Sequence, residues 1–149
     1  MSNNPISQFQ TVDWQIINFD YVRGLLTIPA DIPHQWKLHT HIERLDAEEK
    51  TLHAVVDIRF EMKAEAEGGN ISLSGQCLTG CILDTEGIEN ADELFDRLIK
   101  SSAMVNSLAN LRVFLMQQGA LLQMGQKRVM LPFINLNHYH FDEDVVMTV

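Results

Sequence analysis

Two pairs of histidines are the side chains in this sequence best suited to binding a metal ion or transferring a proton. They are His39 with His41, and His138 with His140. Residues two apart in an extended chain point to the same side, so each pair could present two ring nitrogens together. Zinc sites usually draw their ligands from tight spacings such as CxxC or HExxH, and neither spacing occurs here. Histidines on the solvated face of a strand are therefore the favoured interpretation, with a metal site as a minor alternative.

The only cysteines, Cys77 and Cys81, form the other candidate reactive group. If both lie on one strand, a rise of about 3.3 Å per residue separates their Cα atoms by roughly 13 Å. A disulfide needs Cα atoms closer than about 7 Å, so we expect two buried thiols in a reducing compartment. Neither thiol has a basic neighbour to lower its pKa, which disfavours a Cys nucleophile with a His base. Because GxSxG, P-loop and GxGxxG motifs are also absent, we expect no catalytic residues and no enzyme.

Composition and charge narrow the class of partner. The 149 residues are 46% hydrophobic, which suits a single domain spanning 1–149. The net charge is −9 and Lys and Arg form no cluster, which disfavours binding to nucleic acid or to an anionic membrane surface. The N-terminus lacks a secretory signal, and no stretch approaches the roughly 18 apolar residues of a membrane span. We therefore expect a cytoplasmic protein without membrane insertion.

The elements that must position these residues are strands in the first half of the chain. The segment 52–64 alternates between apolar even positions and mostly polar odd positions, as in a strand with one buried face. The segment 36–45 alternates in the same way and carries the first pair of histidines. A Gly-Gly-Asn turn at 68–70 leads into a fourth strand with both cysteines on its apolar face.

The first strand, at about 12–28, lacks this regular alternation. Its large apolar residues fall on both faces of a regular strand: Trp14, Ile16 and Val22 on one, and Ile17, Phe19 and Tyr21 on the other. A strand that is apolar on both faces needs cover on both sides. We therefore expect a subunit interface to cover the second face.

The second half of the chain reads mainly as helix, and strands followed by helix indicate an α+β domain. From about 105 to 124, leucines recur at helical spacings and predict one long helix. The preceding segment 84–102 is predicted to be a connection with some helix, in which Asn90 and Glu93 form a capping box. The segment 128–137 is expected to be a short extended piece packed on the domain.

Three short stretches, in this order of elements, resemble the SecB protein-export chaperones. The first is Trp36-Lys37 at the start of the second strand, and the second is Gln-Cys-Leu-Thr-Gly-Cys-Ile at 76–82. The third is Pro-Phe-Ile-Asn-Leu at 132–136, followed after four residues by Phe-Asp. It is similar to the family's Pro-x-Leu-Asn-Leu ahead of Phe-Asp and is the most specific of the three. The resemblance covers about 14–142, and the tail 142–149 receives no assignment.

The resemblance implies a four-stranded antiparallel sheet with a long helix packed on one face. It also implies a cofactor-free, ATP-independent holdase, assembled as a dimer or tetramer, that binds unfolded client polypeptides in an apolar groove. The family's groove is lined by the second strand, the crossover and the long helix, which corresponds here to Trp36, Phe95, Leu98, Ile99, Met104 and Leu108. Where the family presents acidic side chains to the SecA motor, this chain has Arg23, Thr27 and Gln76. Client binding is therefore implied more strongly than delivery to SecA in protein export.

Two other functions stay open at this point. One is a SecB-like module dedicated to a single cognate client, such as the antitoxin of a toxin–antitoxin pair. A pull-down that recovers one protein instead of many would favour it. The other is a small metal-binding protein or enzyme that uses the His and Cys residues, for which elemental analysis of the pure protein is the direct test.

Overall fold

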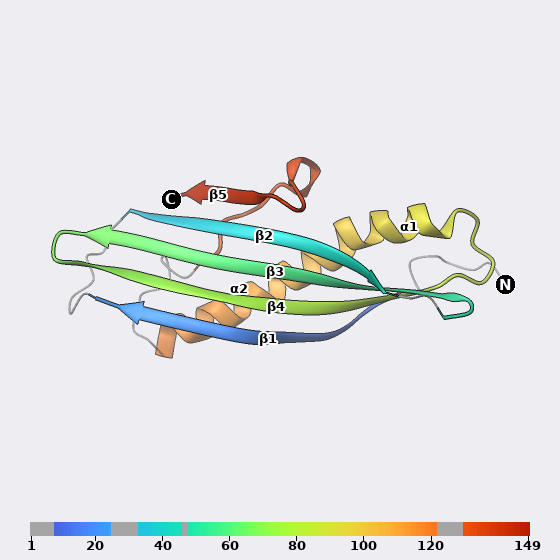
Figure 1. Ribbon diagram of the computed structural model, residues 1–149, viewed down its shortest axis with the longest axis horizontal. Helices are drawn as coiled ribbons and strands as arrows, with labels where there is room; N and C mark the ends of the chain where they lie inside the picture. The colour runs from blue at the N-terminus through green and yellow to red at the C-terminus, as the bar shows by residue number, and fades with distance from the viewer. Residues whose placement is uncertain (1–7, 25–32, 46–47, 122–129) are drawn as a thin grey trace.

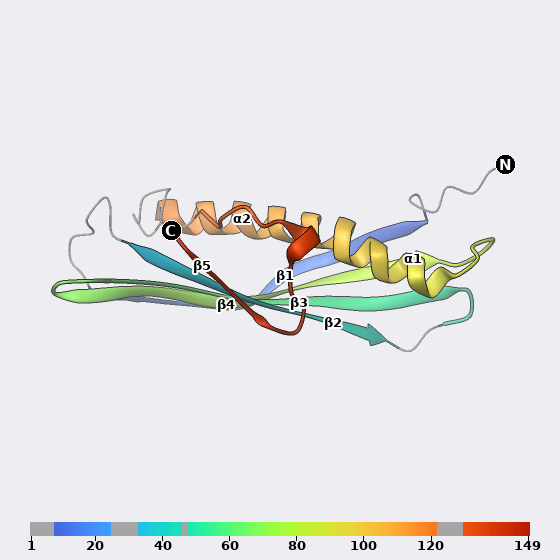
Figure 2. The ribbon, with the colours of Figure 1, turned by 90° about the horizontal axis from the view of Figure 1, so that it is seen from above.

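The computed structural model describes residues 8–24, 33–45, 48–121 and 130–149. They form a two-layer α+β structure, in which a long helical segment lies along one face of an antiparallel sheet (Figures 1 and 2). The strands are β1 (Phe9–Arg23), β2 (His34–Leu45), β3 (Thr51–Ala66), β4 (Gly69–Asp84) and β5 (Asp144–Thr148). Their order in the sheet is β1-β4-β3-β2-β5. The predicted four-stranded antiparallel sheet with a helix on one face is confirmed, and the tail adds a short fifth strand.

The core lies between the sheet and the helical segment. Most even residues of β3 and most odd residues of β4 turn toward the helix and are buried, because alternate side chains of a strand point to opposite faces. The hairpin between these strands turns at Gly68, whose φ of 99° favours glycine. The opposite face of the sheet carries most of the charged side chains of β2 and β3, as the sequence alternation predicted.

The pairing of β1 with β4 contains two register shifts. They fall between Val12 and Gln15 and between Ile16 and Asn18. At each shift β1 advances by one residue more than β4, which is the geometry of a β-bulge. An extra residue exchanges the faces on which all the following side chains of the strand point.

The bulges bring the large apolar side chains of β1 to the helix side of the sheet. Those that pack against the core from this strand are Trp14, Ile16, Phe19 and Tyr21. Trp14 and Phe19 both contact the Phe114 ring, with centroid distances of 6.5 and 5.3 Å. The prediction that these residues divide between two faces is therefore wrong, because it assumed an unbroken period of two. Ile17 and Val22 are exposed.

The helical segment begins earlier than the sequence pattern predicted. It comprises α1 (Ala91–Leu98), a π-helical turn η1 (Ile99–Ala103) and α2 (Met104–Leu121), which follow one another directly. The π turn inserts an extra residue, and the buried side chains continue through it at Ile99, Ala103 and Met104. Asn90 has a left-handed φ of 53° and makes no side-chain capping bond, so the predicted capping box does not form.

The C-terminal segment returns over the helix side of the sheet and ends at its edge. Residues 130–135 have no regular secondary structure, with Leu131 buried as expected of a packed extended piece, and a 3-10 turn, η2 (Leu136–His138), follows. β5 then pairs antiparallel with β2 (Figure 1). Among the described helices, none has the length and apolarity needed to cross a membrane.

Candidate functional site

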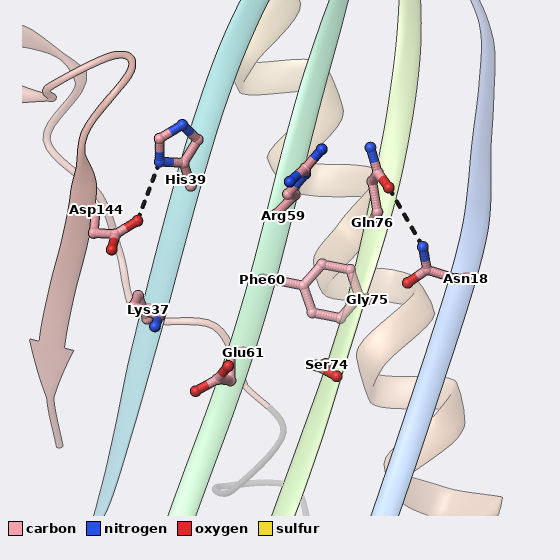
Figure 3. Close-up of a pocket in the computed structure, with 10 residues that line it drawn as sticks. All are labelled: Asn18, Lys37, His39, Arg59, Phe60, Glu61, Ser74, Gly75, Gln76 and Asp144. Carbon is pink, nitrogen blue, oxygen red and sulfur yellow. Dashed lines mark hydrogen bonds and ion pairs between the residues drawn. The ribbon is translucent and has the colours of Figure 1, made fainter.

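The open face of the sheet, opposite the helix, is hollowed and polar at its centre (Figure 3). The hollow measures about 590 Å³ and receives side chains from all five strands. Nε2 of Gln76 donates to both carboxylate oxygens of Asp57 at 2.9 Å, and Nδ2 of Asn18 donates to Oε1 of Gln76 at 3.3 Å. These hydrogen bonds join the two amides and the carboxylate across three strands. Their role here is to fix the positions of the polar side chains on this face.

His39 and His41 both lie on this open face, as the sequence predicted, and each meets a carboxylate of the C-terminal segment. Nδ1 of His39 lies 3.1 Å from Oδ1 of Asp144, and Nδ1 of His41 pairs with Oδ1 of Asp142. The hydrogen bond to the Asp142 carboxylate raises the pKa of His41, because it favours the charged imidazolium. The two histidines therefore bind the C-terminal segment through its carboxylates.

The cysteines lie on the other side of the sheet from these histidines. Cys77 and Cys81 are both free and buried on the helix side of β4, as predicted. Burial raises the pKa of Cys77 to about 12 and that of Cys81 to about 11, so both thiols are protonated near neutral pH. The described ranges contain no group of three or more His, Cys, Asp or Glu side chains arranged to hold a metal ion. The combined His and Cys site considered from the sequence is therefore not assembled.

The six predicted groove residues belong to one core but do not form a single cluster. Phe95 packs against Phe9 and Arg44 at one end of β2, whereas Trp36 pairs with Met62 toward the other end. Trp36, Phe95, Ile99 and Met104 have 0% exposure, and Leu108 has 3%. Leu98 is partly exposed and packs against the same core. Phe95, Leu98 and Ile99 belong to α1 and the π turn rather than to a loop. An open groove at Trp36, which the sequence predicted, is not present in this conformation, since five of the six side chains are sealed from solvent.

Part of this seal is the C-terminal segment, which bridges β2 and the π turn. The Tyr139 hydroxyl lies 2.6 Å from Oγ1 of Thr40, and the Asp142 N–H donates to the Thr40 carbonyl at 2.8 Å. The Phe141 ring packs edge-on against Tyr139 at 5.1 Å and lies under the Lys100 ammonium at 5.6 Å. The aromatic pair therefore lies over the helix-side face of β2.

The N-terminal part of the same C-terminal segment is bound to α2. Arg112 donates to the carbonyls of Leu131 and Pro132 at 3.4 and 3.1 Å, and its guanidinium lies over the Phe133 ring at 5.4 Å. Sequence reasoning missed this cover. Its signal was weak: the spacing of Asp142 and Asp144 matches that of the two histidines, but only the fold brings the two pairs together.

An apolar furrow stays open to solvent beside this seal. It measures about 770 Å³ and lies between the π turn, the start of α2 and η2. Its apolar walls come from Leu98, Val105 and Leu136, with polar side chains of the helix at the rim. A furrow of this size can accept apolar side chains of a peptide.

Comparison with known proteins extends these observations to a fold family. No protein-family model matches the chain, and no curated protein matches it in sequence. Among solved structures it is similar to a SecB-like chaperone of Mycobacterium tuberculosis in complex with a ChAD peptide from the HigA1 antitoxin. The TM-score is 0.64, the sequence identity is 10%, and the match covers 87% of this chain and 93% of that one. The chain therefore has the fold of the SecB-like chaperones.

Proposed function

We propose that this protein is an ATP-independent holdase chaperone that binds unfolded, extended segments of client polypeptides. The observation that carries the proposal is the SecB-like fold over 87% of the chain, in a neighbour whose structure contains a bound peptide. Burying apolar peptide surface contributes about 25 cal/mol per Å² without reading a particular sequence. Such a surface suits a protein that must hold many different unfolded segments.

The proposed client surface has an outer and an inner part. Leu98, Val105 and Leu136 in the open furrow form the outer part, where a client side chain can enter directly. The inner part consists of the five buried residues of the predicted groove: Trp36, Phe95, Ile99, Met104 and Leu108. Of these, Trp36 lies opposite Met147 of β5, so it is the residue that a client contacts once the C-terminal segment has moved away from β2.

An assembly of two or four copies is part of the proposal. α2 carries apolar side chains on the side away from the sheet, where Ala109, Val113 and Met116 are exposed at helical spacing. A helix that is apolar on two sides needs a second partner, and another copy of the chain provides one. We place this activity in the cytoplasm, where buried free thiols such as Cys77 stay reduced.

The test is suppression of aggregation of a chemically denatured client in the absence of ATP. We expect suppression at a stoichiometric excess of the protein, and unchanged aggregation would reject the holdase proposal. Val105→Glu places a charge in the furrow and should weaken suppression several-fold. Asn110→Glu adds the same charge to an exposed position of α2 away from the furrow and should leave it unchanged.

A second candidate is a module dedicated to one cognate client. It is favoured by the partner bound in the structural neighbour, which is a peptide from an antitoxin. Capture of a single protein from a lysate of the native host, in place of a broad set, would select this candidate. Delivery of clients to SecA is less well supported, because the centre of the open face mixes Lys37, Arg59 and Glu61 instead of presenting a row of carboxylates.

A further inference from the structure

We propose that β5 occupies the position of a client strand, and that a client enters by adding an extended segment to the edge of β2 in place of β5. This inference rests on the proposed holdase function and specifies the chemistry of the client. The segment it describes carries apolar residues at alternate positions and a carboxylate opposite His39. It binds antiparallel to β2, as β5 does.

The backbone of β2 is the first argument. Without β5, β2 would be the edge of the main sheet, and an edge strand presents a row of unpaired N–H and C=O groups to any extended chain. β5 pairs with β2 only from Gln35 to His39, although β2 continues to Leu45. A longer extended segment could therefore form the same ladder and extend it.

The side chains along the edge of β2 favour a particular pattern of residues in the strand that pairs with it. On the helix side, Met147 lies opposite Trp36 and Val145 lies opposite Leu38, and both partners from β2 are fully buried. On the open side, Asp144 lies opposite His39, where its carboxylate reaches the imidazole (Figure 3). A strand that replaces β5 must supply two apolar side chains and one acid in this register.

β5 is held loosely in comparison with the other strands. Its outward residues Asp144, Val146 and Thr148 are exposed, and Val145 and Met147 are only half-buried. Few buried contacts make a segment open at low cost, while the core strands stay closed. The indole N–H of Trp36 is buried behind β5 without an acceptor among the described residues. The pairing with β5 therefore leaves an unsatisfied donor that a different strand could satisfy.

Hydrogen exchange in the full-length protein tests the exchange of strands directly. The probe is a reduced and carboxymethylated polypeptide that cannot refold. On its addition, we expect the amides of Val145 and Met147 to exchange at least tenfold faster, while those of β3 stay protected. A client that binds while β5 stays protected would overturn the inference and leave the holdase proposal intact.

Two proline variants provide a matched pair. Val149 and His34 exchange both backbone bonds, at 2.9 and 3.3 Å, so ladder bonds also form at Met147 and Val145, whereas the Val146 N–H points to solvent. Val145→Pro removes a ladder donor and should free the edge of β2. Val146→Pro changes the same strand without removing a ladder bond and serves as the control.

The ligand for these variants is a labelled peptide, Glu-Asp-Val-Val-Met-Thr-Val, which copies residues 143–149. It should bind Val145→Pro at least tenfold more tightly than Val146→Pro, and N-methylation at its ladder amides or Asp→Lys substitution should abolish the difference. Equal binding to both folded variants would refute the edge site. Peptide binding by Val145→Pro together with no client binding by the natural chain would support the edge site and reject the holdase proposal.

Discussion

His41 is the residue at which pH should act on the C-terminal segment. Its pKa is raised chiefly by the hydrogen bond to Asp142, while Glu43 and Asp57 add to the negative potential around it. A folded-state pKa above the ordinary value of 6.5 means that the pairing stabilises the docked tail fully below that value. The stabilisation is lost as the pH rises through the raised pKa of His41.

We therefore expect the tail to be docked more firmly at pH 6 than at pH 8.5. The measurement is the protection of the Asp142 and Val145 amides at the two pH values, corrected for the intrinsic rate of exchange. His41→Gln removes the titrating group and should flatten the difference, while His140→Gln, on the exposed segment before Asp142, should not. A pH dependence that persists in His41→Gln would assign it to another group.

The two thiols should be inert in the folded protein. With a pKa of about 12 for Cys77, the fraction of thiolate at pH 8 is about one in ten thousand, and the side chain is also buried. We expect no measurable reaction of either thiol with a thiol reagent at pH 8, and reaction of two thiols per chain in denaturant. Rapid modification of the native protein would show that β4 opens readily to solvent.

At the scale of elements, the pairing of β1 with β4 depends on the absence of a side chain at Gly75. A Cβ atom there would lie 2.5 Å from Cζ of Phe60 and 2.6 Å from the backbone oxygen of Asn18. Gly75→Ala should therefore displace β1 and lower the free energy of unfolding by about 1–3 kcal/mol in urea denaturation. Gly80→Ala is the matched control, because its nearest atom is a Val12 methyl at 3.0 Å and should cost less. An equal cost for both would contradict this account.

The strands that sequence predicted well are those whose pattern is strictly local. β3 and β4 alternate without interruption, so their faces and both cysteines could be placed from a period of two. β1 could not, since its bulges are defined only by the register with β4. The helix start was misplaced for a related reason, because the π turn at Ile99–Ala103 interrupts the α-helical spacing and joins α1 directly to α2.

The burial of most of the predicted groove residues follows from sequence patterns, but whether a groove there is open to solvent does not. Helical and strand periodicity shows that Trp36 and Phe95 face inward, and the family resemblance suggested a groove. Whether such a groove is open depends on a segment about a hundred residues away, whose pairing with β2 relies on His39 and Asp144 meeting across the fold. Contacts of that kind are fixed by tertiary structure, so local patterns carry little information about them.

At the scale of the whole molecule, the two sides of α2 differ in their contacts. One side packs on the sheet through Leu111 and Leu115, which are completely buried. The other side exposes Val113 at 55% and Met116 at 41%. Because a single chain offers no cover for this second side within the described ranges, the proposed assembly should form by helix-to-helix contact across a symmetry axis.

Val113→Glu tests this arrangement. A charge at the centre of an apolar contact would be buried without a partner, so the variant should shift from an oligomer to a smaller species at micromolar concentration. Light scattering during size-exclusion chromatography measures the mass, and Asn110→Glu, on the same helix but off the apolar side, should keep the mass of the natural chain. If the natural chain itself is monomeric, or if both variants keep the oligomer, the assembly does not use this side of α2. Because Val113 is not among the residues that line the furrow, the monomeric variant should still bind an isolated client segment, which separates assembly from client recognition.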